Sequence, residues 1–268
     1  MLGAIAGDIF GAAYEGQPLK REDFNLFTEA RYFTDDTVLT VATADALMGD
    51  GDYAAAYRDW GNRFPFCGYG PRFRKWLGRP NQGPYNSYGN GSAMRVSPIG
   101  WALDSLEEVL AEAERSAAVT HNHPEGIKGA QATAAAVYMA RRGATKSDIR
   151  HEIAARFDYD LNRTVDAIRP DYRFEVSCQR SVPEALIAFL DADDFEHTLR
   201  LAISLGGDAD TQAAIAGSVA EAFFCGVPER IEAEIETVLD QPLLGVVDRF
   251  GWFAEKKVGA ANGERVTR

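Results

Sequence analysis

The stretch Phe33-Thr34-Asp35-Asp36-Thr37 leads directly into residues 38–47, which are apolar on nearly every side of a helical projection. Thr34 is a good helix N-cap, and the two carboxylates fall in the first turn that follows it. A solvated helix would carry a polar face, and this one has none. The pattern therefore predicts a buried helix whose N-terminus carries Asp35 and Asp36.

A second stretch of the same kind lies far downstream, at Gly206-Gly207-Asp208-Ala209-Asp210-Thr211. The glycine pair is a usual signal for the end of the preceding helix. Residues 213–224 are again small and apolar almost all round, which predicts a second buried helix. In a purely structural interpretation Asp208 caps this helix, and that interpretation leaves Asp210 unexplained.

If the two acidic helix starts meet in space, at least four carboxylates share one pocket. At about 4 Å, a like-charge pair costs roughly 1 kcal/mol in water and about 4 kcal/mol at a near-surface dielectric. A helix N-terminus stabilises a carboxylate by only about 0.3–1 kcal/mol. The repulsion between the carboxylates therefore has to be offset by a divalent cation or by a basic partner, unless the two stretches never meet.

A cation fits the sequence best, because both helices look buried and the chain has no basic run. Oxygen ligands without Cys or His favour Mg²⁺, Mn²⁺ or Ca²⁺ over zinc, and two ions would fit the number of ligands. Residues 1–16, with glycines at 3, 7, 11 and 16, predict a tightly packed helix. Its carboxylate Glu15 is a further candidate, because a carboxylate is seldom buried without a partner or a metal.

Residues 65–100 are rich in glycine, proline and aromatic residues and predict a long irregular segment, of the kind that is usually functional. Within it, Gly89-Asn90-Gly91-Ser92-Ala93-Met94-Arg95 offers backbone N–H groups, a hydroxyl and a guanidinium, which together suit a phosphate or diphosphate. A simple turn is the competing interpretation. His121 and His123 belong to a polar loop, and a ring that lines a pocket is a better functional hypothesis than a metal pair.

The composition describes a folded protein of 268 residues with 46% hydrophobic and 25% charged residues. The net charge of −12 disfavours nucleic acid as a partner. Three scattered cysteines and the lack of a leader or a long apolar run lead us to expect a cytoplasmic protein without a membrane span. Helical patterns without a linker predict a single all-α domain over residues 1–268, with a polar, frayed tail from about residue 254.

Five motifs taken in order resemble those of the ADP-ribosylglycohydrolases, relatives of the dinitrogenase reductase-activating glycohydrolase. They are residues 3–16, 34–37, 89–95, Thr120-His121 and residues 206–211. Any one of them is a weak signal, whereas five in family order make a specific match. The resemblance implies a compact orthogonal multi-helix bundle with a binuclear magnesium site, which manganese occupies in some members.

Carried over by motif, the resemblance implies that Thr34, Asp35 and Asp36 bind one edge of the metal site and that Asp208, Asp210 and Thr211 bind the other. Glu15 falls beside the metals. Asp35, Asp36 or Glu15 would take a proton from the water that attacks the ribose and frees ADP-ribose. The residues from Gly89 to Arg95 would hold the diphosphate, with His121 near it.

Two other functions stay open: a protein that binds ADP-ribose without turnover, and a metal-dependent hydrolase of another ribosyl or nucleotide substrate. We expect an ADP-ribosylated protein as the partner and a monomer, because no apolar seam is evident. The leaving group would sit at a pocket mouth formed by residues 65–88 and 158–180, and the sequence does not identify it.

Overall fold

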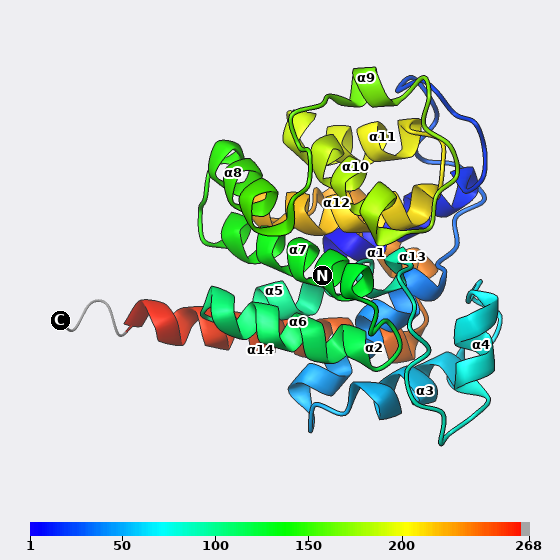
Figure 1. The fold of residues 1–268 in the computed structure, drawn as a ribbon, viewed down its shortest axis with the longest axis vertical. Helices are drawn as coiled ribbons and strands as arrows, with labels where there is room; N and C mark the ends of the chain where they lie inside the picture. Colours follow the sequence, from blue (N-terminus) through cyan, green and yellow to red (C-terminus); the bar gives the residue numbers. More distant parts are fainter. Residues whose placement is uncertain (264–268) are drawn as a thin grey trace.

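Helix α12 (Ala209–Phe223) runs through the middle of the fold and is buried along its length (Figure 1). The computed structural model describes residues 1–263, with side chains to residue 256. The elements in this range are helices without a strand, which confirms the all-α prediction. The other α-helices are α1 (Leu2–Gly11), α2 (Asp35–Met48), α3 (Tyr53–Arg63), α4 (Pro71–Leu77), α5 (Ser97–Ala102), α6 (Leu106–Ala118), α7 (Pro124–Arg141), α8 (Lys146–Phe157), α9 (Val165–Ile168), α10 (Cys178–Asp191), α11 (Phe195–Ser204), α13 (Glu229–Val238) and α14 (Gln241–Gly263).

Helix α1 packs directly against α12, and its glycines allow the two backbones to touch. A Cβ atom at Gly3 would lie 2.1 Å from the carbonyl oxygen of Gly217, and one at Gly7 would lie 2.1 Å from that of Ala213. A real side chain does not fit at such distances. The spacing of four residues that predicted a tightly packed helix therefore marks the face that α1 turns toward α12.

The start of α2 is held by residues from two helices. Thr34 is its N-cap and accepts a hydrogen bond from the backbone N–H of Asp36. Asp8, which is fully buried in α1, accepts hydrogen bonds from the backbone N–H groups of Thr34 and Thr37. Helix α1 therefore fixes where α2 begins, and with it where Asp35 and Asp36 lie.

Helix α12 begins next to this point because the chain turns sharply after α11. Gly206 has a φ of +66°, the left-handed conformation expected of a glycine after a helix. Asp208 stands at the N-cap position, yet its side chain makes no capping hydrogen bond. The structural interpretation of Asp208 as a cap is therefore wrong.

Three helix boundaries differ from the sequence-based expectation. The segment 65–100 contains the short helices α4 and α5. The run Ser181-Val182-Pro183-Glu184 predicts a helix that starts at Ser181, with the proline near its first turn. Helix α10 begins instead at Cys178, where the hydrogen bonds of its first turn already form. Helix α14 continues to Gly263 through most of the tail expected to fray from about residue 254, and residues 264–268 of that tail lie outside the described part.

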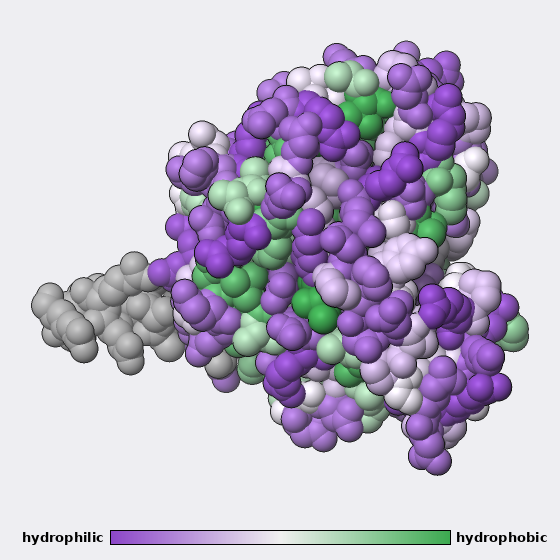
Figure 2. Space-filling view, in the orientation of Figure 1, coloured by the Kyte–Doolittle hydropathy of each residue, from purple (hydrophilic) through white to green (hydrophobic). Residues whose placement is uncertain are grey.

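The face of the molecule drawn in Figure 2 is mostly hydrophilic, with its hydrophobic residues in small separate groups. Among the described residues, no helix combines the length and the apolar composition needed to cross a membrane.

Candidate active site

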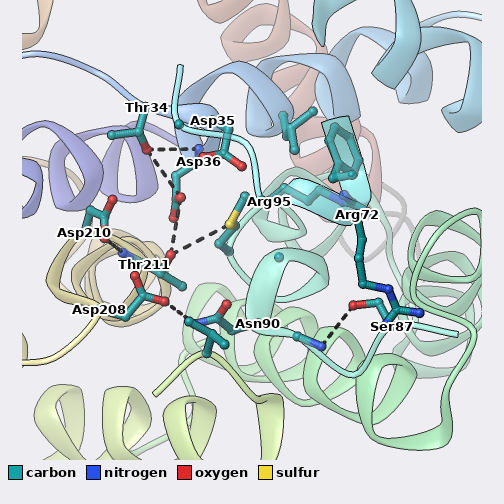
Figure 3. A pocket seen from close by; sticks show the side chains of 18 of the residues that line it. Thr34, Asp35, Asp36, Arg72, Ser87, Asn90, Arg95, Asp208, Asp210 and Thr211 are labelled. Atoms are coloured by element: carbon teal, nitrogen blue, oxygen red, sulfur yellow. Dashed lines mark hydrogen bonds between the residues drawn. The ribbon is translucent and has the colours of Figure 1, made fainter. Parts of the chain in front are cut away.

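A cavity of about 390 Å³ lies where the start of α2, the start of α12 and the turn around Asn90 converge (Figure 3). Both predicted acidic stretches line it, so the stretches meet in space. Glycine-rich and aromatic segments form its other walls, including Gly68, Tyr85 and Phe174. Residues from the segments 65–88 and 158–180 are therefore among those that line the cavity.

Asp36 joins the two acidic stretches. Its Oδ2 accepts a hydrogen bond from the hydroxyl of Thr211 at 3.3 Å and lies 3.4 Å from the hydroxyl of Thr34, whose one proton has a shorter contact with Asp8 at 2.8 Å (Figure 3). Its other oxygen is buried and has no hydrogen-bond partner in the described part of the chain. A buried carboxylate oxygen without a donor carries an uncompensated desolvation cost unless a proton or a cation meets it.

Glu15, Asp208 and Asp210 form a second group, in which one oxygen of each carboxylate lies within 4.8 Å of the others. Asp208 and Asp210 are buried, whereas Glu15 is exposed at the end of the short turn that follows α1. The sequence analysis treated Glu15 as a carboxylate that could be buried in the helix of residues 1–16. The structure places it instead at the surface, at the edge of the acidic cluster.

The carboxylates of the cluster hold their protons more tightly than free carboxylates do. Burial, reinforced by the charge of Asp8, raises the pKa of Asp35 to about 8. Burial raises the pKa of Asp208 to about 6, against the hydrogen bond from Asn90. Burial and the charges of their neighbours raise the pKa values of Asp36 and Asp210 well above the ordinary range. A divalent cation would reverse these shifts, and the hard oxygen donors of the cluster fit such an ion.

Asp8 is the residue that the sequence analysis missed. From residues 1–16 the sequence analysis names only Glu15 as a candidate carboxylate. Burial raises the pKa of Asp8, and hydrogen bonds from Thr34 and Thr37 oppose that shift. The sequence does carry a signal for Asp8, because it is a carboxylate within a helix that has no polar face, one turn before Gly11.

The turn Gly89–Ser92 faces the acidic cluster and is tied to it by one contact. The side-chain amide of Asn90 donates to Oδ2 of Asp208 at 2.6 Å. Met94 lies on the same wall and accepts a contact at its sulfur from the Thr211 hydroxyl at 3.8 Å. Ser92 is turned away, because its hydroxyl donates to the carbonyl oxygen of Gly126 at 2.7 Å. The backbone N–H groups of Gly89 and Asn90 donate to Ser87 and Val176, so within the described chain the N–H of Gly91 is what remains in this turn to meet a ligand.

Arg95 and His121 occupy the wall behind the turn. Arg95 is fully buried and donates to the hydroxyl of Thr120 at 2.9 Å, so its charge is not displayed as the sequence suggested. The ring of His121 lies in the cavity wall beside the turn. An exposed cation that the sequence analysis missed, Arg72 of α4, lies near Ser87 at the same end of the cavity (Figure 3).

The chain was compared with families and with individual proteins of known sequence. Residues 1–256 match the model of the family described as ADP-ribosylglycohydrolase. The chain is 28% identical to ADP-ribosylhydrolase ARH3 of Mus musculus, over 84% of this chain and 82% of that protein. It is also 28% identical to ADP-ribosylarginine hydrolase Tri1 of Pseudomonas putida, over 84% of this chain and 69% of that protein.

A solved structure titled "ADP-ribosylglycohydrolase-related protein complex" superposes with a TM-score of 0.69 at 28% identity, covering 93% of this chain and 96% of that one. The fold, the order of the motifs and the family match over nearly the whole chain agree with one another. The chain belongs to the ADP-ribosylglycohydrolase family of enzymes.

Proposed function

We propose that the protein is a Mg²⁺-dependent hydrolase that cleaves the ribosidic bond of ADP-ribosylated substrates, most of all of a modified protein side chain, and releases ADP-ribose. One observation carries the proposal. Five carboxylates, on Glu15, Asp35, Asp36, Asp208 and Asp210, converge at one end of a cavity whose other end is a glycine-rich turn.

The acidic end suits a pair of Mg²⁺ ions, with Mn²⁺ as an alternative. Thr34, Asp35 and Asp36 would hold one edge of the site, and Asp208, Asp210 and Thr211 the other. Bound there, the ions would supply Lewis-acid stabilisation of hydroxyl oxygens at neutral pH.

The glycine-rich end suits the diphosphate of ADP-ribose. Gly89, Asn90 and Gly91 line the cavity. The backbone N–H of Asn90 donates to the carbonyl oxygen of Val176 and that of Gly89 to the hydroxyl of Ser87, so within the described chain the N–H of Gly91 is the one left to meet an anion. The ribose would then lie between the turn and the carboxylates. This arrangement brings the anomeric carbon to the carboxylates.

The chemical step is hydrolysis of a glycosidic bond. A water attacks the anomeric carbon, the bond to the leaving group breaks with its electron pair going to that group, and the proton of the water passes to a carboxylate. Asp35 suits the role of base best, because it is only partly buried in the cavity wall. Asp36 already accepts a hydrogen bond from the hydroxyl of Thr211, and Glu15 lies at the exposed edge.

The test is a panel of arginine-linked, serine-linked and nucleic-acid-linked ADP-ribose substrates, each incubated with Mg²⁺, with Mn²⁺ and with EDTA. We expect release of ADP-ribose that stops with EDTA and in Asp36→Asn. Release that continues in EDTA would refute the metal dependence. Tight ADP-ribose binding without release from any linkage would show a binding protein, and turnover of only free nucleotides or small ribosides would show another hydrolase.

We also propose that the chain works as one domain, as a monomer and in the cytoplasm. Three free cysteines, among them the exposed Cys225, suit a reducing compartment.

A further inference from the structure

Arg95 is a fully buried cation with no acidic partner within hydrogen-bond distance in the described chain. Its Nη2 donates to the carbonyl oxygen of Ser116 at 3.4 Å and to the hydroxyl of Thr120 at 2.9 Å. Its guanidinium lies over the ring of Tyr57, 4.1 Å from the centroid. Burying a guanidinium is costly, so the contact with Thr120 calls for a functional explanation.

The hydroxyl of Thr120 lies between two groups and has one proton to give. An arginine nitrogen can only donate, so Oγ1 of Thr120 accepts from Arg95. The other neighbour of Oγ1 is Nδ1 of His121, at 2.7 Å. Thr120 is fully buried. If Nδ1 of His121 carried a proton, the hydroxyl proton of Thr120 would have no acceptor among its contacts.

The hydroxyl therefore donates to Nδ1, and the proton of the neutral ring of His121 sits on Nε2. That nitrogen faces the glycine-rich turn. A Cβ at Gly91 would lie 3.2 Å from Nε2, and one at Gly89 would lie 3.7 Å from it. In the described chain Nε2 makes no hydrogen bond to a protein group. It is a free donor in the cavity wall.

The surroundings of the ring favour its neutral form. Burial lowers the pKa of His121 well below its ordinary value, and the nearby charges of Arg95 and Arg72 lower it further. The ring of Tyr85 packs beside it, with the centroids 6.0 Å apart. No carboxylate is among the groups that shift it.

We propose that Arg95, acting through the hydroxyl of Thr120, is a positioning residue that holds His121 as the Nε2–H tautomer, so that His121 donates a hydrogen bond to the diphosphate at the Gly89–Ser92 turn. The identity of the anion rests on the proposed function. These contacts give a role to the buried Arg95, three residues after the turn. Its guanidinium orients the hydroxyl of Thr120, which in turn orients the neutral ring of His121.

Nuclear magnetic resonance of ¹⁵N-labelled protein tests the tautomer directly, because a protonated and an unprotonated ring nitrogen differ widely in chemical shift. The chain has four histidines, so His123→Gln, His151→Gln and His197→Gln identify the signals of His121 by elimination. We expect the free wild-type protein to show the Nε2–H tautomer of His121. Finding the Nδ1–H tautomer or an equal mixture would overturn the inference without any variant of Thr120.

Thr120→Val keeps the shape of the side chain and removes the hydroxyl. We expect it to release the tautomer of His121 into a mixture and to raise the Kd for ADP-ribose, measured with Mg²⁺ present, about tenfold. Thr120→Ser restores the hydroxyl, and we expect it to restore both the tautomer and the affinity. A merely structural role of Thr120 would leave the tautomer of His121 unchanged in Thr120→Val, and that result would overturn the inference.

The two readouts separate this inference from the proposed function. If wild-type protein does not bind ADP-ribose, the proposed function and the assigned ligand both fail, whatever the tautomer. If the protein binds and hydrolyses ADP-ribosyl substrates but Thr120→Val binds ADP-ribose as tightly as wild type, the function stands and the inference fails.

Discussion

The carboxylate of Asp8 accepts hydrogen bonds from both the backbone N–H and the hydroxyl of Thr34, at 2.9 and 2.8 Å. A third bond comes from the backbone N–H of Thr37 at 3.0 Å. Asp8 thereby attaches the middle of α1 to the first turn of α2. The orientation of Asp35 and Asp36, which lie between Thr34 and Thr37, depends on a residue that does not line the cavity.

Asp8→Asn should lower both stability and activity. The amide NH2 would take the place of the oxygen that accepts from the hydroxyl of Thr34, and the remaining neutral oxygen would accept the two backbone N–H groups more weakly than a carboxylate does. Bonds to a charged group are worth about 1.5–3 kcal/mol each. We expect a loss of about 2–4 kcal/mol and a fall in Tm of roughly 5–10 °C. The matched control is Asp59→Asn, because Asp59 is exposed and its one ion pair among the described residues is with Arg63. Equal Tm values for the two variants would refute the role of Asp8.

The acidic site could be predicted from the sequence because its signal is local. Two hydroxyl and carboxylate runs stand at the starts of helices that lack a polar face, and the structure brings them together as expected. The contribution of Asp8 could not be predicted in this way. It depends on the packing of α1 against α12 and α2, which joins residues 26 positions apart.

Arg95 shows a second limit of the sequence. A guanidinium after a glycine-rich turn suggests a ligand contact, and only the position of Thr120 shows that the charge is used inside the wall. Arg72 was missed for the opposite reason. It lies in a segment expected to be irregular, and the short helix α4 brings it to the cavity.

The contact of α1 with α12 predicts that Gly7→Ala is severely destabilising. The new Cβ would lie 2.1 Å from backbone atoms of Ala213, which cannot rotate away. Overpacking usually costs about 1–3 kcal/mol, and we expect the upper end of that range or more. Chemical denaturation measures it.

The control for this substitution is Gly251→Ala in α14. A Cβ there meets nothing within 4 Å, and alanine is favoured over glycine inside a helix by about 1 kcal/mol. We expect Gly251→Ala to stabilise the protein slightly. Similar effects of the two substitutions would contradict the close approach of α1 and α12.

Arg72→Gln should weaken the binding of ADP-ribose. Arg72 is the exposed cation at the end of the cavity that holds Ser87 and the glycine-rich turn, and removing a charged partner of a phosphate costs about 1.5–3 kcal/mol. We expect the Kd for ADP-ribose to rise about tenfold or more and the Kd for adenosine to change little.

Arg74→Gln is the matched control, since Arg74 is on the same helix, is exposed and does not line the cavity. Calorimetry gives the Kd of each variant for ADP-ribose and for adenosine, and we expect only Arg72→Gln to weaken the binding of ADP-ribose. If Arg74→Gln weakens ADP-ribose binding as much as Arg72→Gln does, general attraction rather than contact explains the effect.

Asp36→Asn should abolish activity and remove the rise in Tm that Mg²⁺ produces in wild type. In the absence of metal and at high pH, we expect Asp36→Asn to stabilise the folded protein rather than destabilise it. Where the pH is high enough to ionise Asp36, whose pKa burial raises, the variant lacks one negative charge of a buried cluster in which each close pair costs about 4 kcal/mol at an intermediate dielectric. We expect the metal-free variant to melt at or above the temperature of metal-free wild type there. A lower Tm together with a retained response to Mg²⁺ would rule out Asp36 as a ligand.

The raised pKa values of Asp35, at about 8, and Asp208, at about 6, predict the direction of the pH dependence. Between the ordinary carboxylate pKa of 3.8 and these values, the folded metal-free protein binds more protons than the unfolded chain. Its stability therefore falls as pH rises from about 4 to about 8. The variant Asp35→Asn with Asp208→Asn isolates this contribution, because it should flatten that fall.

Binding of Mg²⁺ to the same carboxylates must expel the protons they hold. Calorimetric titration in buffers of different ionisation enthalpy counts the protons released, and we expect release at pH 6 that diminishes toward pH 9 as Asp35 loses its proton unaided. Mg²⁺ should correspondingly raise the Tm more at pH 8, where its binding competes with fewer protons, than at pH 6. Metal binding without proton release at pH 6 would show that these carboxylates are ionised before the cation arrives, and it would contradict the burial that raises their pKa values.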